Sequence, residues 1–257
     1  MADELLLGVD GGIATITLNR PEKRNALNRA VIEGLRRRFD ELEGTDGVRV
    51  VVVRGAGPAF CSGMDLREME EGPASGADPE SGVTEVLQRI ERSRHPTIAV
   101  IHGDALAGGC ELALHCDLRI AAEGARLGMP LARIGLVVPF PLGQKLVEIV
   151  GPAFTRELLF TGRPVGARRA YEMGMVHQVV PAVELEASTS ALARAVADNA
   201  PLSLAGMKAT ILRAASLRER IEHQDLDDLA RRARQSADAH EGRRAMLEKR
   251  KPRFRGE

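Results

Sequence analysis

The stretches Ile101-His-Gly-Asp-Ala-Leu-Ala-Gly-Gly-Cys-Glu-Leu-Ala113 and Ala59-Phe-Cys-Ser-Gly-Met-Asp-Leu66 decide the fold. In each, an apolar run ends in small residues, and a sequence that favours a helix follows. Backbone N–H groups in the first turn of a helix have no acceptor inside the helix, so they can bind a negatively charged oxygen. Two such turns that face one point would make an oxyanion hole, with Glu111 beside it. This combination predicts chemistry on a carbonyl compound.

Both stretches resemble segments of the crotonase superfamily, the enoyl-CoA hydratase/isomerase family. The likeness begins at Ile16-Thr-Leu-Asn-Arg-Pro-Glu-Lys-Arg-Asn-Ala-Leu-Asn28 and continues through Val50-Val-Val-Val-Arg-Gly-Ala-Gly57. It ends at Glu241-Gly-Arg-Arg-Ala-Met-Leu-Glu-Lys-Arg-Lys-Pro-Arg-Phe-Arg-Gly256. The resemblance implies an α/β fold, a crotonase-like spiral of ββα units with a C-terminal helical region. Residues 1–200 would form the spiral core, and residues 201–257 the helical oligomerisation region of a homotrimer or a dimer of trimers.

Composition narrows the class of partner. The chain of 257 residues holds 36 Lys and Arg against 36 Asp and Glu, so nothing favours a nucleic-acid partner or an anionic membrane surface. No apolar run approaches the roughly 20 residues that a membrane helix needs. The acidic N-terminus, with an apolar run of only three residues, does not resemble a signal peptide. We therefore expect a cytoplasmic enzyme with a small-molecule substrate.

Three cysteines, Cys61, Cys110 and Cys116, are too few and too unevenly spaced to indicate a disulfide framework. Cys110, His115 and Cys116 lie on one predicted helix, at spacings that do not converge on one metal ion. We expect small buried thiols and no metal site.

Periodicity and punctuation predict alternating strands and helices. Residues 72–82, rich in Gly, Pro and Ser, are expected to form a mobile surface loop. Residues 202–251 are expected to form a separate helical layer. Strands are predicted at residues 13–19, 48–54, 97–102, 118–121 and 126–128. Helices are predicted at residues 29–43, 66–71, 155–160, 167–173 and 185–199. Three further helices are predicted: one from the end of the loop to residue 93, one that starts at residue 108, and one that follows the turn at 135–143 and ends at residue 150.

The resemblance assigns roles at the two turns. Met64 and Gly108 match the oxyanion-hole positions, where the backbone N–H groups act, and Glu111 matches the first of two catalytic glutamates of the hydratases. Two simpler interpretations remain open. In the first, the glycines of these turns have no role beyond permitting tight backbone turns. In the second, Glu111 has no role beyond capping its helix.

Two further segments match the positions that hold coenzyme A in the family, largely through backbone contacts. They contain Arg24, Ala26 and Leu27, and Asp65, Leu66 and Arg67. Coenzyme A would enter as part of an acyl-CoA substrate, with no separate cofactor. Arg24 is also interpretable as an ordinary solvated arginine, and the basic tail at residues 249–255 either helps to bind phosphates or is a solvated charged tail.

The second glutamate of the hydratases is missing. In Met129-Pro-Leu-Ala-Arg-Ile-Gly135, Leu131 stands where that acid is expected. The next loop, Leu136-Val-Val-Pro-Phe-Pro-Leu-Gly143, replaces a Gly-rich turn, so Leu131 and Val138 are expected to line a drier and stiffer acyl pocket. Glu111 would then act as the single acid and base on an enolate formed from the thioester.

Other reactions stay open on the same scaffold. They are an acyl-CoA decarboxylase, a thioester hydrolase, and a catalytically silent acyl-CoA-binding protein. An acid that enters the pocket from Glu68, Glu70 or Glu71 would discriminate among them. Arg133 is either a cation near the pocket or a solvated side chain.

Overall fold

A six-stranded sheet forms the centre of the computed structural model, which describes residues 3–71, 79–215 and 222–256. Its strands follow the order β1-β2-β3-β5-β7-β10, and the pairs from β2 to β10 are parallel, whereas β1 and β2 form an antiparallel hairpin. Its strands are β1 (Leu5–Asp10), β2 (Ile13–Leu18), β3 (Val50–Gly55), β5 (Thr97–Ile101), β7 (Leu118–Ala122) and β10 (Gln178–Val180).

A smaller sheet of four strands lies beside the first and produces the repeating unit. It contains β4 (Ala59–Cys61), β6 (Asp104–Leu106), β8 (Arg126–Gly128) and β9 (Val165–Gly166). Each of β3, β5 and β7 in the large sheet is followed along the chain by one strand of the small sheet, and then by a helix. This is the ββα repeat expected from the sequence, and it brings the turns after β4 and β6 to the same edge.

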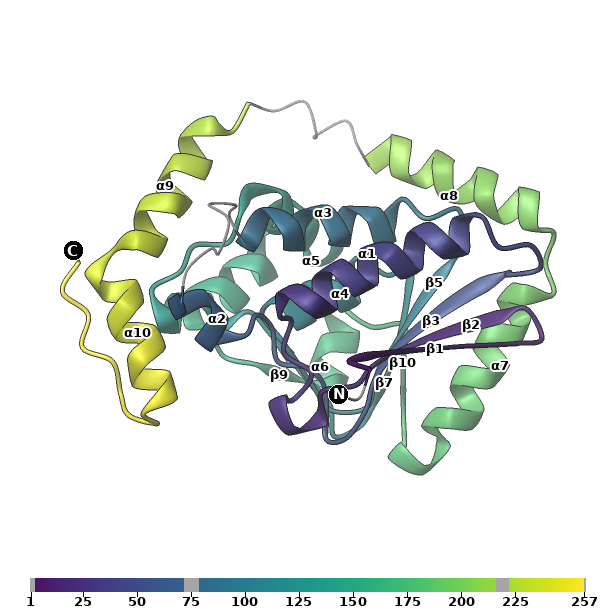
Figure 1. Ribbon diagram of the computed structural model, residues 1–257, viewed down its shortest axis with the longest axis horizontal. Helices are drawn as coiled ribbons and strands as arrows, with labels where there is room; N and C mark the ends of the chain where they lie inside the picture. Colours follow the sequence, from purple (N-terminus) through teal and green to yellow (C-terminus); the bar gives the residue numbers. More distant parts are fainter. Residues whose placement is uncertain (1–2, 72–78, 216–221, 257) are drawn as a thin grey trace.

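The helices cover both faces of the large sheet and the edge where the small sheet lies (Figure 1). In the described part of the chain, three short 3₁₀ helices each lie between a strand and the next α-helix: η1 (Pro21–Lys23), η2 (Pro130–Ile134) and η3 (Ala182–Glu184). The α-helices are α1 (Arg29–Glu43), α2 (Leu66–Glu71), α3 (Pro79–Glu91), α4 (Gly108–Leu114), α5 (Phe140–Thr161), α6 (Ala167–Glu172), α7 (Leu185–Ala197), α8 (Pro201–Ala215), α9 (Gln224–Gln235) and α10 (Ala237–Leu247).

Strand β3 shows why the sheet needs helices on both faces. Side chains alternate across a strand, so Val51 and Val53 pack into the main core with α1, α3 and α4, whereas Val50 and Val52 pack against α7. Burial of each valine contributes about 2 kcal/mol. The continuous run of β-branched residues in the sequence therefore indicates a strand that is covered on both faces.

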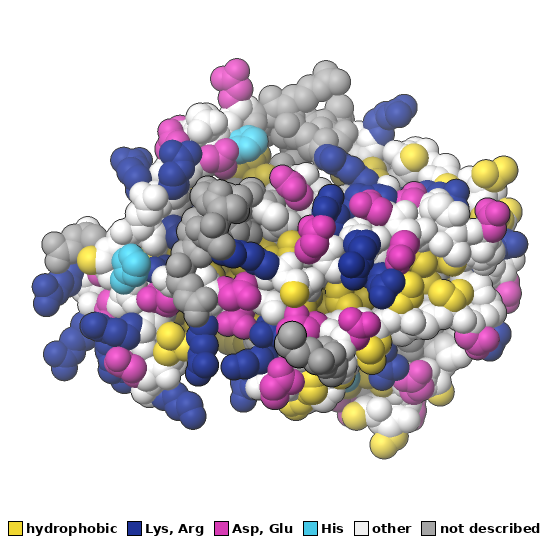
Figure 2. Space-filling model, viewed as in Figure 1, with side chains coloured by type: hydrophobic (Ala, Val, Ile, Leu, Met, Phe, Trp, Pro, Cys, Tyr) yellow, Lys and Arg dark blue, Asp and Glu magenta, His cyan; other side chains and the backbone are white. Residues whose placement is uncertain are grey.

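Positively and negatively charged side chains are mixed over the face of the molecule that is shown in Figure 2. Figure 2 shows Lys and Arg side chains interspersed with Asp and Glu over the face that is viewed. Among the described helices, none combines the length and the apolar character that a membrane crossing requires.

The three C-terminal helices meet the core at two separate places (Figure 1). Lys208 of α8 reaches Asp117 at the start of β7, where the Nζ–Oδ2 distance is 2.7 Å. Helix α10 packs on η2 so closely that a Cβ at Gly242 would lie 2.5 Å from the backbone of Ile134. The proposed division at residue 200 remains a prediction.

Some predicted boundaries were wrong. The expected loop at residues 72–82 falls partly outside the described residues, and its last four residues belong to α3, which begins at Pro79. Proline suits the first turn of a helix, where its missing N–H costs no hydrogen bond. The predicted helices ending at residue 150 and starting at 155 are the two halves of α5, which is kinked at Gly151 with φ of 72°.

Candidate active site

The turn before α4 has a strained backbone. Ala107 adopts φ of 49° and ψ of −122°, a conformation that residues with a side chain rarely occupy. The first turn of α4 also leaves no room for a side chain at Gly109, because a Cβ there would lie 2.2 Å from the carbonyl oxygen of Cys61 in β4. Strain of this kind persists only where the surrounding structure holds it, and it is concentrated at functional sites.

The turn after β4 presents the backbone of Met64 to the same place. Met64 forms a parallel bridge with Leu27, in which the N–H of Leu27 donates to the carbonyl of Gly63 and the N–H of Asp65 donates to the carbonyl of Leu27. In such a bridge the N–H of Met64 itself points away from Leu27. A Cβ built on Gly108 would lie 3.7 Å from the Met64 nitrogen, so the two turns are in contact.

The N–H of Gly108 complements that of Met64. Gly108 is the first residue of α4, so its N–H has no acceptor within the helix. Gly63, with φ of 94°, allows the close approach, since a Cβ there would lie 3.2 Å from the Gly108 nitrogen. The structure therefore brings together the two N–H groups that the sequence singled out.

Glu111 lies one turn into α4 and is completely buried. Neither carboxyl oxygen has a hydrogen-bond partner among the described residues. Burial raises the pKa of Glu111 well above its usual value, and the positive charge of Lys145 opposes that shift. A helix-capping carboxylate would accept N–H bonds, and this one accepts none from the described residues, so it does not cap α4.

A narrow apolar cavity of about 100 Å³ opens beside Glu111 and the two turns. Leu131 lines it, as expected, beside an almost entirely hydrocarbon wall. Its lining is Ser62, Met64, Leu66, Met69, Val83, Ala107, Gly108, Glu111, Met129, Pro130, Leu131, Ile134, Leu136, Val137, Pro139, Leu142 and Met246.

Two features of this lining differ from the sequence-based expectation. Val138 does not line the cavity; its neighbour Val137 does, and Val138 instead borders a hollow with Phe140 and Leu229. The segment between η2 and α5 has no regular period, so the sequence could not assign the facing side chain. Met246 was missed because α10 reaches the cavity from the far end of the chain, which no local pattern reports.

The segments expected to hold coenzyme A lie side by side. The N–H of Ser62 donates to the carbonyl of Arg24, and the N–H of Arg67 donates to the Asp65 carboxylate. The side chains of Arg24 and Arg67 are exposed, and Leu66 lines the cavity. Of the expected residues, these two arginines are free to meet an incoming phosphate group.

Ala26 and Leu27 play a different part in this segment. Both side chains are buried, and the backbone N–H and C=O of Leu27 already bond to Gly63 and Asp65. The carbonyl of Ala26 accepts from Nη1 of Arg20 at 2.7 Å, and Arg20 also pairs with Asp65 at 3.1 Å. Arg20, which sequence reasoning missed, therefore fixes the two segments against each other.

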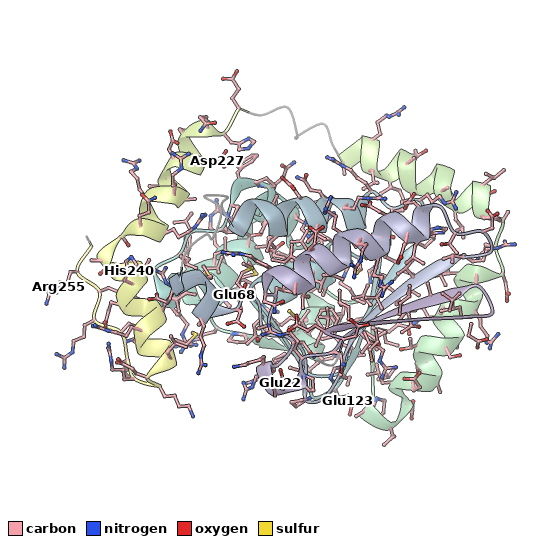
Figure 3. All side chains as sticks on the ribbon, in the orientation of Figure 1. Glu22, Glu68, Glu123, Asp227, His240 and Arg255 are labelled. Atoms are coloured by element: carbon pink, nitrogen blue, oxygen red, sulfur yellow. The ribbon has the colours of Figure 1, made fainter. Side chains whose placement is uncertain are left out.

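The acids considered as replacements for the missing glutamate have other partners. Glu68 accepts from the N–H of Arg29 at 3.0 Å and lies between α2 and the start of α1 (Figure 3). Glu70 pairs with Arg243 of α10 at 2.5 Å. The side chain of Glu71 lies outside the described residues.

The candidate cations are also placed away from the cavity. Arg133 is exposed and covers Gly162, where a Cβ would lie 2.8 Å from its Cγ. Arg255, in the basic tail, stands at the outer side of the C-terminal region (Figure 3). In the basic tail, Arg250 pairs with Glu241 at 2.5 Å, so part of the tail's charge is neutralised by its own helix.

The three cysteines are buried thiols, and burial raises the pKa of Cys61 and of Cys116 to about 12. Within residues 3–71, 79–215 and 222–256, no three His, Cys, Asp or Glu side chains converge in a way that would hold a metal ion.

Comparison with known proteins places this site in context. A family model described as enoyl-CoA hydratase/isomerase matches residues 8–257. A putative enoyl-CoA hydratase of Thermus thermophilus is 37% identical over 255 residues, covering 95% of this chain and 98% of that protein. A probable enoyl-CoA hydratase of Bacillus subtilis is 36% identical over 259 residues, covering 98% of each.

Solved structures agree on the fold. A methylmalonyl-CoA decarboxylase complexed with 2S-carboxypropyl-CoA superposes with a TM-score of 0.90 at 27% identity, over 100% of both chains. An enoyl-CoA hydratase/carnitine racemase from Magnetospirillum magneticum superposes with a TM-score of 0.80 at 33% identity, over 100% of this chain and 97% of that one. The expected spiral of ββα units with C-terminal helices is confirmed.

Proposed function

This chain belongs to the enoyl-CoA hydratase/isomerase family, and we propose that it hydrates short 2-enoyl-CoA thioesters with Glu111 as its single acid and base. The observation that carries this proposal is a fully buried carboxyl without a hydrogen-bond partner, beside two converging N–H groups. A buried, unpaired ionisable group is costly for the fold, which supports a role in chemistry.

The N–H groups of Met64 and Gly108 would donate hydrogen bonds to the carbonyl oxygen of the thioester. Backbone amides held by β4, β6 and the Leu27 bridge are already oriented, so they need no rearrangement as negative charge develops on that oxygen. Two such donors supply roughly 3–4 kcal/mol each towards the enolate-like transition state. The enolate is thereby stabilised without a metal ion or an added cofactor.

Glu111 would move the protons. As a carboxylate it takes a proton from water while that water attacks Cβ, and as the resulting acid it gives the proton to Cα. Because the cavity lining is almost entirely apolar and Leu131 offers no hydrogen bond, one carboxyl must both hold and activate the water. Loss of one acid–base group typically costs 10²–10⁴ in rate, so turnover should be slower than that of an enzyme with two glutamates.

The lining disfavours the rival reactions. Among the described residues that line the cavity, none is a cation. A second carboxylate on the acyl group, as in a methylmalonyl thioester, would enter next to Glu111 without a counter-charge. The cavity is also smaller than the roughly 150 Å³ that accommodates benzene in an engineered protein core, which favours acyl groups of about four carbons.

The remaining expectations belong to the same proposal. Coenzyme A would be bound as part of the substrate, with Arg24 and Arg67 near its phosphates. The enzyme would work in the cytoplasm without a separate cofactor, as a homotrimer or a dimer of trimers in which the C-terminal helices contribute contacts.

The test combines binding and turnover on the wild-type protein. Calorimetry with butyryl-CoA and with free coenzyme A should detect binding of the thioester at sub-millimolar ligand. Crotonyl-CoA should lose its enoyl-thioester absorbance with formation of a hydroxyacyl-CoA. Release of free thiol from crotonyl-CoA would instead identify a hydrolase, and conversion of methylmalonyl-CoA alone would identify a decarboxylase. Binding without any conversion would leave a silent acyl-CoA-binding protein.

A further inference from the structure

His115 lies one helical turn after Glu111, at the end of α4, and is 3% exposed. Its Nδ1 is 2.8 Å from the carbonyl oxygen of Glu111 and 3.8 Å from Oε2 of the Glu111 carboxyl. A carbonyl oxygen can only accept a hydrogen bond, so Nδ1 carries the hydrogen and Nε2 is unprotonated in this arrangement. The N–H of the imidazole therefore donates to the backbone of Glu111, and the carboxyl of the same residue lies within 3.8 Å of Nδ1.

The same imidazole borders a second cavity on the other side. This polar cleft, of about 560 Å³, is lined by His115 together with Glu91, Gln144, Lys145 and Glu148. Lys145 pairs there with Glu91 at 2.5 Å and with Glu148 at 3.0 Å. Glu111 lines the apolar cavity and His115 lines the polar cleft, so the pair spans the wall between them.

We propose that His115 is a positioning residue that exchanges the proton of Glu111 with water in the polar cleft while an acyl group fills the apolar cavity. The inference rests on the proposed role of Glu111. An occupied acyl cavity separates Glu111 from bulk water, and the described lining of that cavity offers no second ionisable side chain. His115 supplies a route that bypasses the substrate.

The transfer balances without any further reactant. Nε2 takes a proton from water in the cleft, and the Nδ1–H proton passes to Oε2 of the Glu111 carboxylate. The products are a neutral Glu111 acid, an imidazole with its hydrogen on Nε2, and a hydroxide ion in the cleft. The reverse steps return the proton to the cleft. The 3.8 Å separation must shorten to hydrogen-bond length, as catalytic contacts commonly do once substrate is bound.

The backbone carbonyl gives this exchange a direction. When Glu111 holds the proton, the unprotonated Nδ1 faces the Glu111 carbonyl oxygen, and their hydrogen bond is lost. The arrangement with an ionised Glu111 and a hydrogen on Nδ1 keeps that bond. Directly after the transfer, the lost bond therefore favours return of the proton through His115 to the cleft, which restores the Glu111 carboxylate.

Solvent exchange at Cα of butyryl-CoA tests the proposal. In D₂O, Glu111 must remove a Cα proton and replace it with solvent deuterium, which NMR follows directly. Two variants separate the functions of the imidazole. In His115→Asn the side-chain amide can donate at the position of Nδ1 but cannot relay, and His115→Leu does neither. We expect both variants to exchange at least about tenfold more slowly than wild type, with unchanged butyryl-CoA affinity.

Added imidazole provides a readout that a merely structural role would not move. In His115→Ala, free imidazole that enters from the cleft should restore exchange in proportion to its concentration. His102→Asn is the matched control, because His102 contacts the carbonyl of Gly57 at 2.9 Å and lines neither cavity. Wild-type exchange rates in His115→Leu would overturn the proposal. Absence of both exchange and crotonyl-CoA hydration in wild type would instead overturn the proposed function.

Discussion

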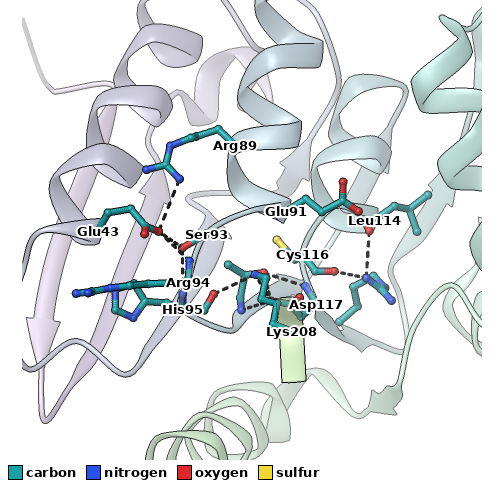
Figure 4. A network of polar contacts seen from close by, with 12 residues as sticks. Glu43, Arg89, Glu91, Ser93, Arg94, His95, Leu114, Cys116, Asp117 and Lys208 are labelled. Atoms are coloured by element: carbon teal, nitrogen blue, oxygen red, sulfur yellow. Dashed lines mark hydrogen bonds and ion pairs between the residues drawn. The ribbon is translucent and has the colours of Figure 1, made fainter. Parts of the chain in front are cut away.

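Two carboxylates near the ends of the short helix α4 differ in their hydrogen bonding. Glu111, in the first turn of α4, has no hydrogen-bond partner among the described residues. Asp117, three residues after the helix ends, accepts at Oδ2 from the N–H and hydroxyl of Thr97 and from Nζ of Lys208, at 2.7, 2.8 and 2.7 Å. Figure 4 shows Asp117 and Lys208 within this network. One carboxyl has no donor among the described residues, and the other has three donors on a single oxygen.

The surroundings of α4 explain how one helix supports both. At its C-terminal end, the guanidinium of Arg119 donates to the carbonyls of Leu114 and Cys116, which satisfies acceptors that have no partner in the helix (Figure 4). At its N-terminal end the chain is strained at Ala107. A firmly held end thus anchors the end that carries the unsatisfied groups. The two carboxylates also differ in burial, because the side chain of Asp117 is 30% exposed and that of Glu111 is completely buried.

The largest effect should come from Glu111→Gln. Glutamine keeps the size of the side chain and removes the base, so crotonyl-CoA turnover should fall about 100-fold or more, with little change in thioester affinity. The absorbance of the enoyl thioester and calorimetry with butyryl-CoA measure the two quantities. Glu123→Gln, at an exposed position, is the control. Wild-type turnover in Glu111→Gln would show that another group carries the chemistry.

The opposite result is expected for Asp117→Ala. Removing this carboxylate leaves Lys208, whose side chain is 7% exposed, without its counter-charge. The free energy of unfolding should fall by about 2–3 kcal/mol, while turnover per folded molecule changes little. Urea unfolding at pH 7, followed by circular dichroism, measures the first. An unfolding free energy equal to that of wild type would mean that water replaces the carboxylate at no cost.

How far the sequence predicts this arrangement depends on the range of each signal. The strand β3 and helix α1 follow from a β-branched run and from the N-cap Asn28, whose side chain accepts from the N–H of Val31. The two turns and Glu111 follow from glycine patterns and family resemblance. These signals are local, and the structure places those elements where they were expected.

The missed features depend on contacts between distant segments. Met246 reaches the cavity from α10, and Arg20 bonds both Ala26 and Asp65, the latter 45 residues away in the sequence. The sequence predicts no metal site at His115 and gives that residue no other role. Only the geometry shows that His115 lies between the apolar cavity and the polar cleft. No sequence period encodes which side of an irregular loop faces inward, which is why Val138 was assigned in place of Val137.

Leu131→Glu would sharpen the comparison by giving Glu111 a partner acid. Leu131 lines the cavity where the resemblance places the second carboxylate of the hydratases. A carboxylate there can accept a hydrogen bond from the attacking water, so crotonyl-CoA hydration should rise about tenfold. Leu131→Gln is the matched control, because it has similar size and no charge. Equal or lower rates in Leu131→Glu across pH 6–9 would mean that one glutamate already suffices.

The smallest effect concerns the stability cost of keeping Glu111 unpaired. Burial raises the pKa of Glu111 in the folded protein, so above the unfolded-state value the folded protein binds more protons than the unfolded chain. The contribution of Glu111 to stability is therefore present at low pH and is lost as pH rises toward the folded-state pKa. Glutamine does not titrate, so it escapes this loss.

Glu111→Gln should therefore be the more stable protein at neutral pH, by about 1–2 kcal/mol, although it is the less active one. The difference should shrink as pH falls toward 4.5. His115, whose pKa burial lowers to about 4, titrates in both proteins, so its own loss of stability below about pH 6.5 largely cancels in the comparison. Urea midpoints at pH 5, 6, 7 and 8 measure the trend. A pH-independent difference would mean that Glu111 is ionised at no cost, and that the contrast with Asp117 is geometric rather than energetic.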